Sequence, residues 1–188
     1  MARRSPDRRR IDFVFAQVMD LPRRQPSPQL SKRLDALFDD LGQRRPSREP
    51  DDIEDLIWAI WIDHVNARAS ASMAAATQAM MAGERDLARP ILDRLIEDHP
   101  DWAEAWNKRA TVAFLDKRDD QSVEDLAEAL RLEPRHFGAV SGFAQICLRR
   151  GYLEEARASF QMALRINPHL QGVDDIIEAL GRSMDRPH

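Results

Sequence analysis

Five histidines and one cysteine are the side chains of this sequence best suited to bind a metal ion or act in catalysis. Three of them, His99, His136 and His169, stand beside prolines that end helical runs. They therefore recur with the loops and do not converge on one pocket. His64 follows Asp63 on a predicted helix, but no His or Glu follows at the i+4 position that a zinc-protease helix requires. The sequence predicts neither a metal site nor a catalytic histidine.

Cys147 is the single cysteine, so an internal disulfide and a cysteine-based zinc site are both excluded. No flanking charges indicate a lowered thiol pKa, and we expect Cys147 to be a buried packing residue. The glycines are scattered singly and form no phosphate-binding loop. Acidic pairs such as 154–155 and 174–175 lie at predicted helix starts, where they stabilise the positive end of the helix dipole. We therefore expect a non-catalytic protein without a cofactor.

The composition is that of a soluble helical protein. Of 188 residues, 43% are hydrophobic and 32% are charged, which allows one ordinary domain with tails. Helix-forming residues dominate, and this favours an all-α fold. No apolar run approaches the roughly 20 residues that span a bilayer, so we expect no transmembrane segment. We expect a cytoplasmic protein.

The first 29 residues differ from the rest in charge. Residues 1–33 hold nine Lys or Arg and three Asp, a net +6 against −4 for the whole chain, so the remainder carries −10. Because prolines interrupt the segment, we expect residues 1–29 to be a basic arm that is disordered or forms a short amphipathic piece. The basic run at residues 8–10, followed by apolar residues, also resembles a degenerate secretory signal, and a working signal would make the protein periplasmic or exported.

Two amphipathic helices are predicted between residues 30 and 66. The first has apolar residues at the i, i+3, i+4 and i+7 spacing of one helix face: Leu34, Leu37, Phe38 and Leu41. The second begins near Asp51 and Asp52, which suit the positive end of its dipole. Its apolar residues are Ile53, Leu56, Ile57, Ile60 and Trp61. We expect both helices to pack on the N-terminal side of the following segment.

Three prolines, Pro100, Pro134 and Pro168, end consecutive helical runs at a regular interval of about 34 residues. Such a period is typical of a helix-turn-helix solenoid. Together with small residues at the predicted helix contacts and large residues between them, it resembles the tetratricopeptide repeat family. The resemblance covers about residues 69–170, in two clear copies and a weaker first one.

The resemblance implies a right-handed α-solenoid whose helix pairs bury a continuous core only when stacked. The repeats are expected at 67–100, 101–136 and 137–170, followed by a capping helix at 171–181 and a tail at 182–188. The residues expected to pack the repeats together are Trp106, Ala110, Ala129, Pro134, Ala144, Ala156, Phe160, Ala163 and Pro168. Gly83 and Gly151 suit turns with positive φ, whereas the middle copy has Lys117 and its charged neighbours there and is expected to turn differently.

In this family the first helix of each repeat lines a concave face that holds a partner peptide or helix. The inward positions implied here include Met80, Phe114, Ser141 and Leu148, and the candidate partner-binding residues are Met73, Thr77, Asn107, Lys108, Thr111, Gln145 and Arg149. Only Lys108 is basic among the positions that grip acidic chaperone tails in the family. We therefore do not expect a chaperone-tail clamp.

The sequence thus predicts a non-catalytic interaction module, a scaffold that binds a protein or peptide in the concave groove. Two alternatives remain open. One is a self-associating structural or cell-envelope protein that packs through its Met-rich first repeat. The other is a subunit whose basic arm contacts an acidic surface, although arginines without interleaved aromatic residues give no strong nucleic-acid signal. The sequence does not indicate the oligomeric state.

Overall fold

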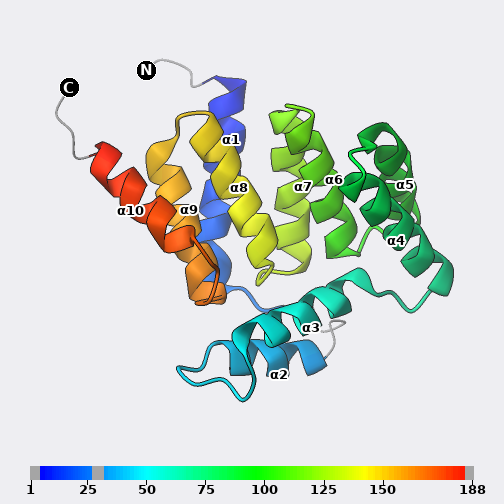
Figure 1. Ribbon diagram of the computed structural model, residues 1–188. Helices are drawn as coiled ribbons and strands as arrows, with labels where there is room; N and C mark the ends of the chain where they lie inside the picture. Colours follow the sequence, from blue (N-terminus) through cyan, green and yellow to red (C-terminus); the bar gives the residue numbers. More distant parts are fainter. Residues whose placement is uncertain (1–4, 27–31, 185–188) are drawn as a thin grey trace.

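The computed structural model describes residues 5–26 and 32–184, and within these ranges the chain forms helices and no strand. In chain order the elements are α1 (Pro6–Asp20), η1 (Leu21–Arg23, a short 3-10 helix), α2 (Lys32–Leu41), α3 (Pro50–Ile62), α4 (Ala67–Met81), α5 (Arg85–Asp98), α6 (Ala103–Leu115), α7 (Asp119–Leu132), α8 (Phe137–Arg149), α9 (Leu153–Ile166) and α10 (Val173–Met184). Figure 1 shows α4 to α9 as three neighbouring helix pairs, with α2 and α3 crossing below them. The all-α repeat fold predicted from the sequence is confirmed.

Each pair consists of an A helix (α4, α6 or α8) and a B helix (α5, α7 or α9) joined by the same turn. The A helices end at residues 81, 115 and 149, and the B helices begin at 85, 119 and 153. The turn residue is left-handed in all three copies, with φ of 75° at Gly83, 60° at Lys117 and 77° at Gly151. In each copy the next N–H donates to the carbonyl five residues earlier over 2.8 Å, which caps the A helix.

The different turn expected in the middle copy is therefore not found. A left-handed conformation costs an L-residue roughly 1–2 kcal/mol. The extensive packing of α6 on α7 outweighs that cost at Lys117. The helix pair sets the turn, and the turn residue adapts to it.

Small buried residues let the helices of each pair approach closely. Ala110, Ala129, Ala144, Ala156 and Ala163 are almost completely inaccessible to solvent. Phe160 is buried as well, while Trp106 is half-buried and contacts the cores of both the first and the second repeat.

The repeat-ending prolines behave differently from one another. Pro134 is buried, as a packing residue should be, but Pro168 is exposed. The prediction that Pro168 packs the repeats together is therefore wrong. Proline stops a helix because it lacks an N–H and because its ring clashes with the preceding turn, and neither property requires burial.

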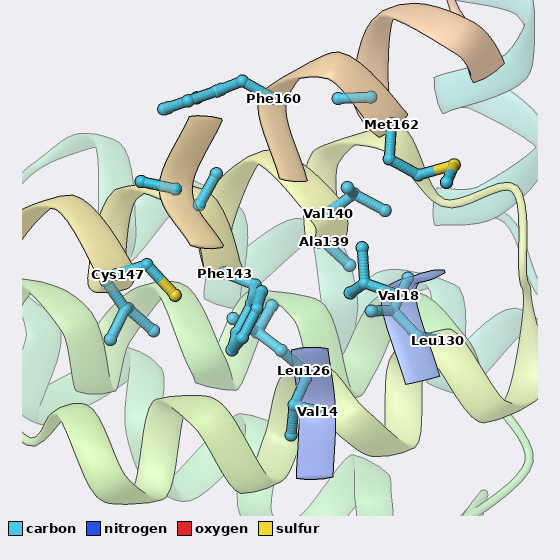
Figure 2. Close-up of a cluster of buried hydrophobic side chains, with 14 of the residues drawn as sticks. Val14, Val18, Leu126, Leu130, Ala139, Val140, Phe143, Cys147, Phe160 and Met162 are labelled. Atoms are coloured by element: carbon cyan, nitrogen blue, oxygen red, sulfur yellow. The ribbon is translucent and has the colours of Figure 1, made fainter. Parts of the chain in front are cut away.

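The N-terminal segment is an ordered amphipathic helix over its described part. Ser5 accepts a hydrogen bond from the Arg8 N–H and caps α1. Ile11, Val14 and Val18 recur at helical spacing and are buried against α7 and α9. In Figure 2, Val14 and Val18 of α1 point toward side chains of α7 and α8.

Of the two forms expected for the basic arm, the structure shows an amphipathic helix rather than disorder within residues 5–26. Residues 1–4 and 27–29 lie outside the described residues. An apolar stripe that stacks on an existing hydrophobic surface outweighs the conformational entropy lost on ordering, even in a segment rich in Arg and Pro.

The basic arm and the acidic body predicted from the sequence neutralise one another within the chain. Arg8 pairs with Asp12 on its own helix and with Glu155 of α9. Arg10 lies 3.1 Å from Asp120 and 2.9 Å from Glu124 of α7. The charge asymmetry therefore orients α1 on the repeats.

Helices α2 and α3 run across the turns that join one repeat to the next. The Trp61 ring stacks on His136 with 4.1 Å between centroids, and the indole N–H of Trp102 donates to the Trp61 carbonyl over 2.7 Å. The amide of Asn167 donates to Glu54 over 2.8 Å. The pair thus braces the two turns that join successive repeats and the turn that leads into α10, along the lower edge of the array (Figure 1), rather than stacking on its N-terminal side.

The C-terminal helix α10 packs on α9 and buries Val173 and Leu180. It begins within the segment where a capping helix was expected and continues to Met184, inside the predicted tail. Residues 185–188 lie outside the described residues. None of the helices described is long and apolar enough to cross a membrane.

Candidate partner-binding face

The A helices form the inner side of the array. Backbone contacts join α4 to α6 and α6 to α8, whereas no comparable contact joins the B helices α5, α7 and α9 to one another. A stack whose members are closer on one side curves toward that side. We call the exposed surface of α4, α6 and α8 the A face.

A row of polar side chains crosses the middle of the A face. Thr77, Thr111 and Gln145 recur at the repeat interval and therefore take the same place on successive A helices. Thr111 and Gln145 are exposed, and Thr77 is half-buried. The Gln145 amide and the Thr111 hydroxyl oxygen can bond to the backbone of an extended peptide, whereas the Thr111 hydroxyl donates to the Asn107 carbonyl and the Thr77 hydroxyl is buried.

An apolar row lies one helical turn further on, at the C-terminal ends of the A helices. Met81, Leu115 and Leu148 are 85%, 48% and 39% exposed. Met81 and Leu115 are repeat-equivalent, and Leu148 precedes the third equivalent position, Arg149. Isolated exposed apolar residues are ordinary, but one at the same end of each of three neighbouring helices is a candidate surface for a partner.

Arg149 is held at the edge of this row. Its guanidinium carbon lies 3.6 Å from the centroid of the Phe114 ring, and Nη1 donates to the Phe114 carbonyl over 3.0 Å. The same side chain pairs with Asp119. Arg149 thus covers the end of α6, although the side chain remains exposed.

Asn107 and Lys108 belong to a buried charge network. The carboxylate of Glu104 is completely buried, and the Asn107 amide donates to it over 2.9 Å. Lys108 Nζ lies 3.2 Å from Glu104 Oε1, and His136 Nε2 lies 2.9 Å from Oε2. Since His136 Nδ1 accepts the Ala139 N–H, its Nε2 carries the proton toward Glu104.

Two opposing effects act on the pKa of Glu104. Burial raises it, but hydrogen bonds from His136 and Asn107 and the positive charge of Lys108 lower it more strongly. The net result is a pKa below the usual glutamate value, so the carboxylate stays ionised. The network holds α6 to the start of α8 and leaves Asn107 without an accessible amide.

Trp58 of α3 covers the N-terminal end of the A face. The Lys108 ammonium lies 5.8 Å from the centre of a Trp58 ring. A Cβ atom on Gly138 would lie 2.7 Å from Cη2 of the same indole, which requires glycine at the start of α8. The accessible part of the A face therefore begins at the polar row and ends at the apolar row.

Two of the seven predicted partner-binding residues are core residues. Met73 is completely buried, and Asn107 is 7% exposed. Each lies on the side of its A helix that faces the interior of the helix pair, one position before a residue of the A face. Thr111 and Gln145 are exposed on the A face, Thr77 is partly so, and Lys108 and Arg149 are held by ion pairs.

The sequence interpretation missed Met81 and Leu115 among the exposed A-face residues. Their signal was available in the sequence, because the two are separated by the same interval as the repeat-ending prolines. The A-helix positions chosen from the sequence stopped one residue short, at Met80 and Phe114. Both of these side chains are partly buried.

The described residues contain no cluster of three or more His, Cys, Asp or Glu that could hold a metal ion. His64 and His99 approach each other, with ring centroids 4.3 Å apart, and both lie beside Trp102. Burial and the neighbouring His99 lower the pKa of His64. Cys147 is buried, and burial raises the pKa of its thiol to about 12, so it is a packing residue.

Comparison with known proteins gives consistent matches. A family model described as tetratricopeptide repeat matches residues 73–129 and 120–170. A TPR repeat-containing protein of Rhizobium etli is 34% identical over 145 residues, which cover 77% of this chain and 71% of that protein.

Solved structures share the fold at lower identity. The first TPR domain of Spaghetti, bound to an HSP90 peptide, aligns with a TM-score of 0.60 and 18% identity over 65% of this chain and 98% of that one. MamA of strain MSR-1 aligns with a TM-score of 0.52 and 18% identity over 82% of this chain and 88% of that one. The TPR domain of Arabidopsis OM64 aligns with a TM-score of 0.58 and 16% identity over 61% and 95%.

Proposed function

This chain belongs to the tetratricopeptide repeat family, whose members commonly mediate protein–protein interaction. From that premise we propose that it binds a peptide or helix across the A face, between the polar row and the apolar row. The observation that carries the proposal is the exposed apolar row formed by Met81, Leu115 and Leu148.

The two rows suit different parts of a bound segment. The Gln145 amide offers a donor and an acceptor to a peptide backbone, and the Thr111 hydroxyl oxygen offers a further acceptor. The apolar row offers surface to hydrophobic side chains, and Met81 can adapt its shape to different residues. Binding therefore depends on apolar anchors, with polar contacts that set orientation.

This arrangement does not favour an acidic tail as the ligand. Lys108 is the one basic residue among the candidate clamp positions, and it already pairs with Glu104 beneath Trp58. The first TPR domain of Spaghetti was solved bound to an HSP90 peptide, but the similarity of this chain to that domain is one of fold alone. We therefore propose a ligand with apolar side chains rather than one recognised by its carboxylates.

The test uses peptides selected from a random phage-displayed library on the immobilised full chain. Their affinity is then measured by fluorescence anisotropy for the wild type and for the triple variant Met81→Ser/Leu115→Ser/Leu148→Ser. We expect a loss of about tenfold or more, because central apolar anchors each contribute more than about 1 kcal/mol.

The matched control removes an equal number of exposed apolar side chains outside the A face. Val65→Ser/Leu87→Ser/Ile176→Ser changes the loop before α4, helix α5 and helix α10. The control should bind the selected peptides as the wild type does. Peptides that lose affinity for the control and keep it for the A-face variant would place binding elsewhere.

The two alternatives raised by the sequence find less support. The Met-rich first repeat offers Met81 to solvent, but Met73 is buried in its core. The basic arm directs Arg8 and Arg10 into ion pairs with the repeats. Each alternative requires these side chains to be exposed at a surface. Met73, Arg8 and Arg10 instead make contacts within the chain.

A further inference from the structure

A second surface with the properties of an interface lies on the side of the B helices. A cleft of about 620 Å³ lies at the surface between α1 and the outer side of α7. Trp106, Val123 and Ala127 provide apolar lining, and the remaining lining residues are mostly charged. This cleft is remote from the A face, because it is formed by α1, α7 and the B-helix side of Trp106.

Phe13 projects into water at the rim of the cleft. Arg10 and Gln17, which lie on either side of Phe13 along α1, both bond to α7: Arg10 pairs with Glu124, and Gln17 donates to the Ala127 carbonyl over 2.9 Å. These contacts fix the face of α1 that carries Phe13. The ring is nevertheless 69% exposed. A large aromatic ring held in a rigid helix and left in water is a potential interface anchor.

The two sides of the cleft carry opposite charges. Arg9 and Arg10 lie on the α1 side, and Glu124 and Glu128 lie on the α7 side. Several charges around the cleft are already paired within the chain: Arg10 with Glu124, Glu128 with Arg131, and Arg109 with both Asp93 and Asp125. A partner that fits must therefore bring a projecting apolar side chain for the cleft, and must avoid placing charges of the same sign against its two edges.

A second copy of this chain meets both conditions. In a two-fold dimer the same patch is used by both copies, so an anchor and its pocket must lie side by side on one surface. Phe13 is such an anchor, and the cleft beside it is such a pocket. We propose that the chain forms a homodimer in which Phe13 of each copy enters the cleft of the other, with α1 of one copy alongside α7 of the other.

The charge pattern sets the orientation of the two copies. A two-fold axis that runs along the cleft places α1 of one copy opposite α7 of the other, and brings Arg9 of one copy toward the Glu124 and Glu128 side of the other. A two-fold axis that runs across the cleft would place α1 against α1 and α7 against α7, which brings like charges together and costs binding energy. The dimer leaves the A faces of both copies free, so it is independent of the proposed peptide binding.

Sedimentation velocity of the full chain over a range of concentrations tests the dimer. The wild type should shift from monomer to dimer as concentration rises. Phe13→Ser should raise the dissociation constant at least about tenfold, the usual effect of losing a central anchor. Because the ring is mostly exposed, the thermal unfolding of Phe13→Ser should match that of the wild type.

Leu87→Ser is the matched control, since Leu87 is an exposed apolar residue of α5 with 59% of its surface accessible. It should dimerise as the wild type does. Arg9→Glu provides a second variant and should also weaken the dimer, by placing an acid against the acidic α7 edge. A wild type that stays monomeric at every concentration overturns the proposal, and so does a Phe13→Ser variant that dimerises normally. A dimer lost in Met81→Ser but kept in Phe13→Ser would assign the contact to the first repeat, which also overturns it.

Discussion

The carboxylate of Glu104 is ionised although it is completely buried, and three partner residues stabilise its charge. His136 and Asn107 satisfy one oxygen, and Lys108 neutralises the charge. A buried carboxylate with fewer partners would be neutral or would destabilise the fold. The charge therefore commits α6 and the start of α8 to one relative position.

The pH dependence of stability should report this network. Because the pKa of Glu104 is lowered in the folded state, its contribution is complete above the ordinary value of 4.5 and is lost as pH falls through the lower folded pKa. Glu104→Gln should be less stable at neutral pH by about 1.5–3 kcal/mol, because its amide N–H groups face other donors. Its stability should also fall less steeply below pH 4.5 than that of the wild type.

Urea unfolding of both proteins over a pH series measures this difference. Two curves that remain parallel through the acidic range would show that Glu104 does not titrate in the way its contacts require.

Lys117 offers a direct test of the turn geometry. It has φ of 60°, whereas the equivalent residues in the other repeats are Gly83 and Gly151. Lys117→Gly should raise the free energy of unfolding by about 0.5–1 kcal/mol, because relief of the left-handed strain exceeds the extra freedom of glycine when unfolded. Urea denaturation gives the value.

Gly151→Ala is the complementary change at the third copy of the same turn. Nothing lies within 4 Å of the added methyl group, so the cost measured is that of the backbone conformation alone. It should destabilise by a similar amount. A stability decrease in Lys117→Gly would mean that the lysine side chain contributes more than its backbone strain costs.

At the scale of the element, α1 occupies one of two comparable positions on the B helices. It lies against α7 and α9, where Val123, Ala127 and Met162 face it. The equivalent positions one repeat earlier, facing a groove between α5 and α7, are Arg89, Asp93 and Glu128. Arg109 bridges α5 and α7 in that region. The repeats thus have the same backbone arrangement, but only the groove between α7 and α9 is lined by apolar side chains.

The docking of α1 should be measurable as stability. Ile11 is completely buried, so Ile11→Ala should lower the free energy of unfolding by about 2–5 kcal/mol through lost apolar contact and a residual cavity. Phe13→Ala, on the exposed side of the same helix, should change it by less than about 0.5 kcal/mol. Chemical denaturation measures the free energy of unfolding of both variants. If neither substitution changes it, α1 does not dock on the repeats.

Helices α2 and α3 act as a brace because their contacts recur with the repeat. Trp102 and His136 take equivalent positions in successive repeats, and both contact Trp61. Leu170, at the next equivalent position, packs on the same aromatic cluster. In a solenoid, each repeat ordinarily contacts only the repeats next to it. Here α2 and α3 tie together the two inter-repeat turns and the turn that leads into α10.

For the whole molecule, the arrangement separates two surfaces with different chemistry. The A face offers a polar and an apolar row to a peptide, and the B-helix side offers the Phe13 cleft to a second copy. Because they are formed by different side chains, changes on one should leave the other intact: Phe13→Ser should retain peptide affinity, and the A-face triple variant should retain dimerisation. The brace closes the lower edge and limits the A face at Trp58.

The sequence determined the repeat architecture because local chemistry repeats with the backbone. The interval between Pro100, Pro134 and Pro168 set the length of each unit, and small residues such as Ala144 marked where helices approach. The polar row at Thr111 and Gln145 followed from the same interval. These features depend on neighbours within one helix pair, which a periodic pattern describes.

Only the tertiary structure decided how the non-repeating parts attach. The stripe at Ile11, Val14 and Val18 was present in the sequence, but its partner surface on α7 and α9 exists only after folding. The burial of Glu104 and Asn107 depends on Trp58, Trp61 and His136, which come from distant segments. An isolated helix shows which face is apolar, but not which surface covers it. Long-range packing therefore decided which predicted groove residues remain accessible.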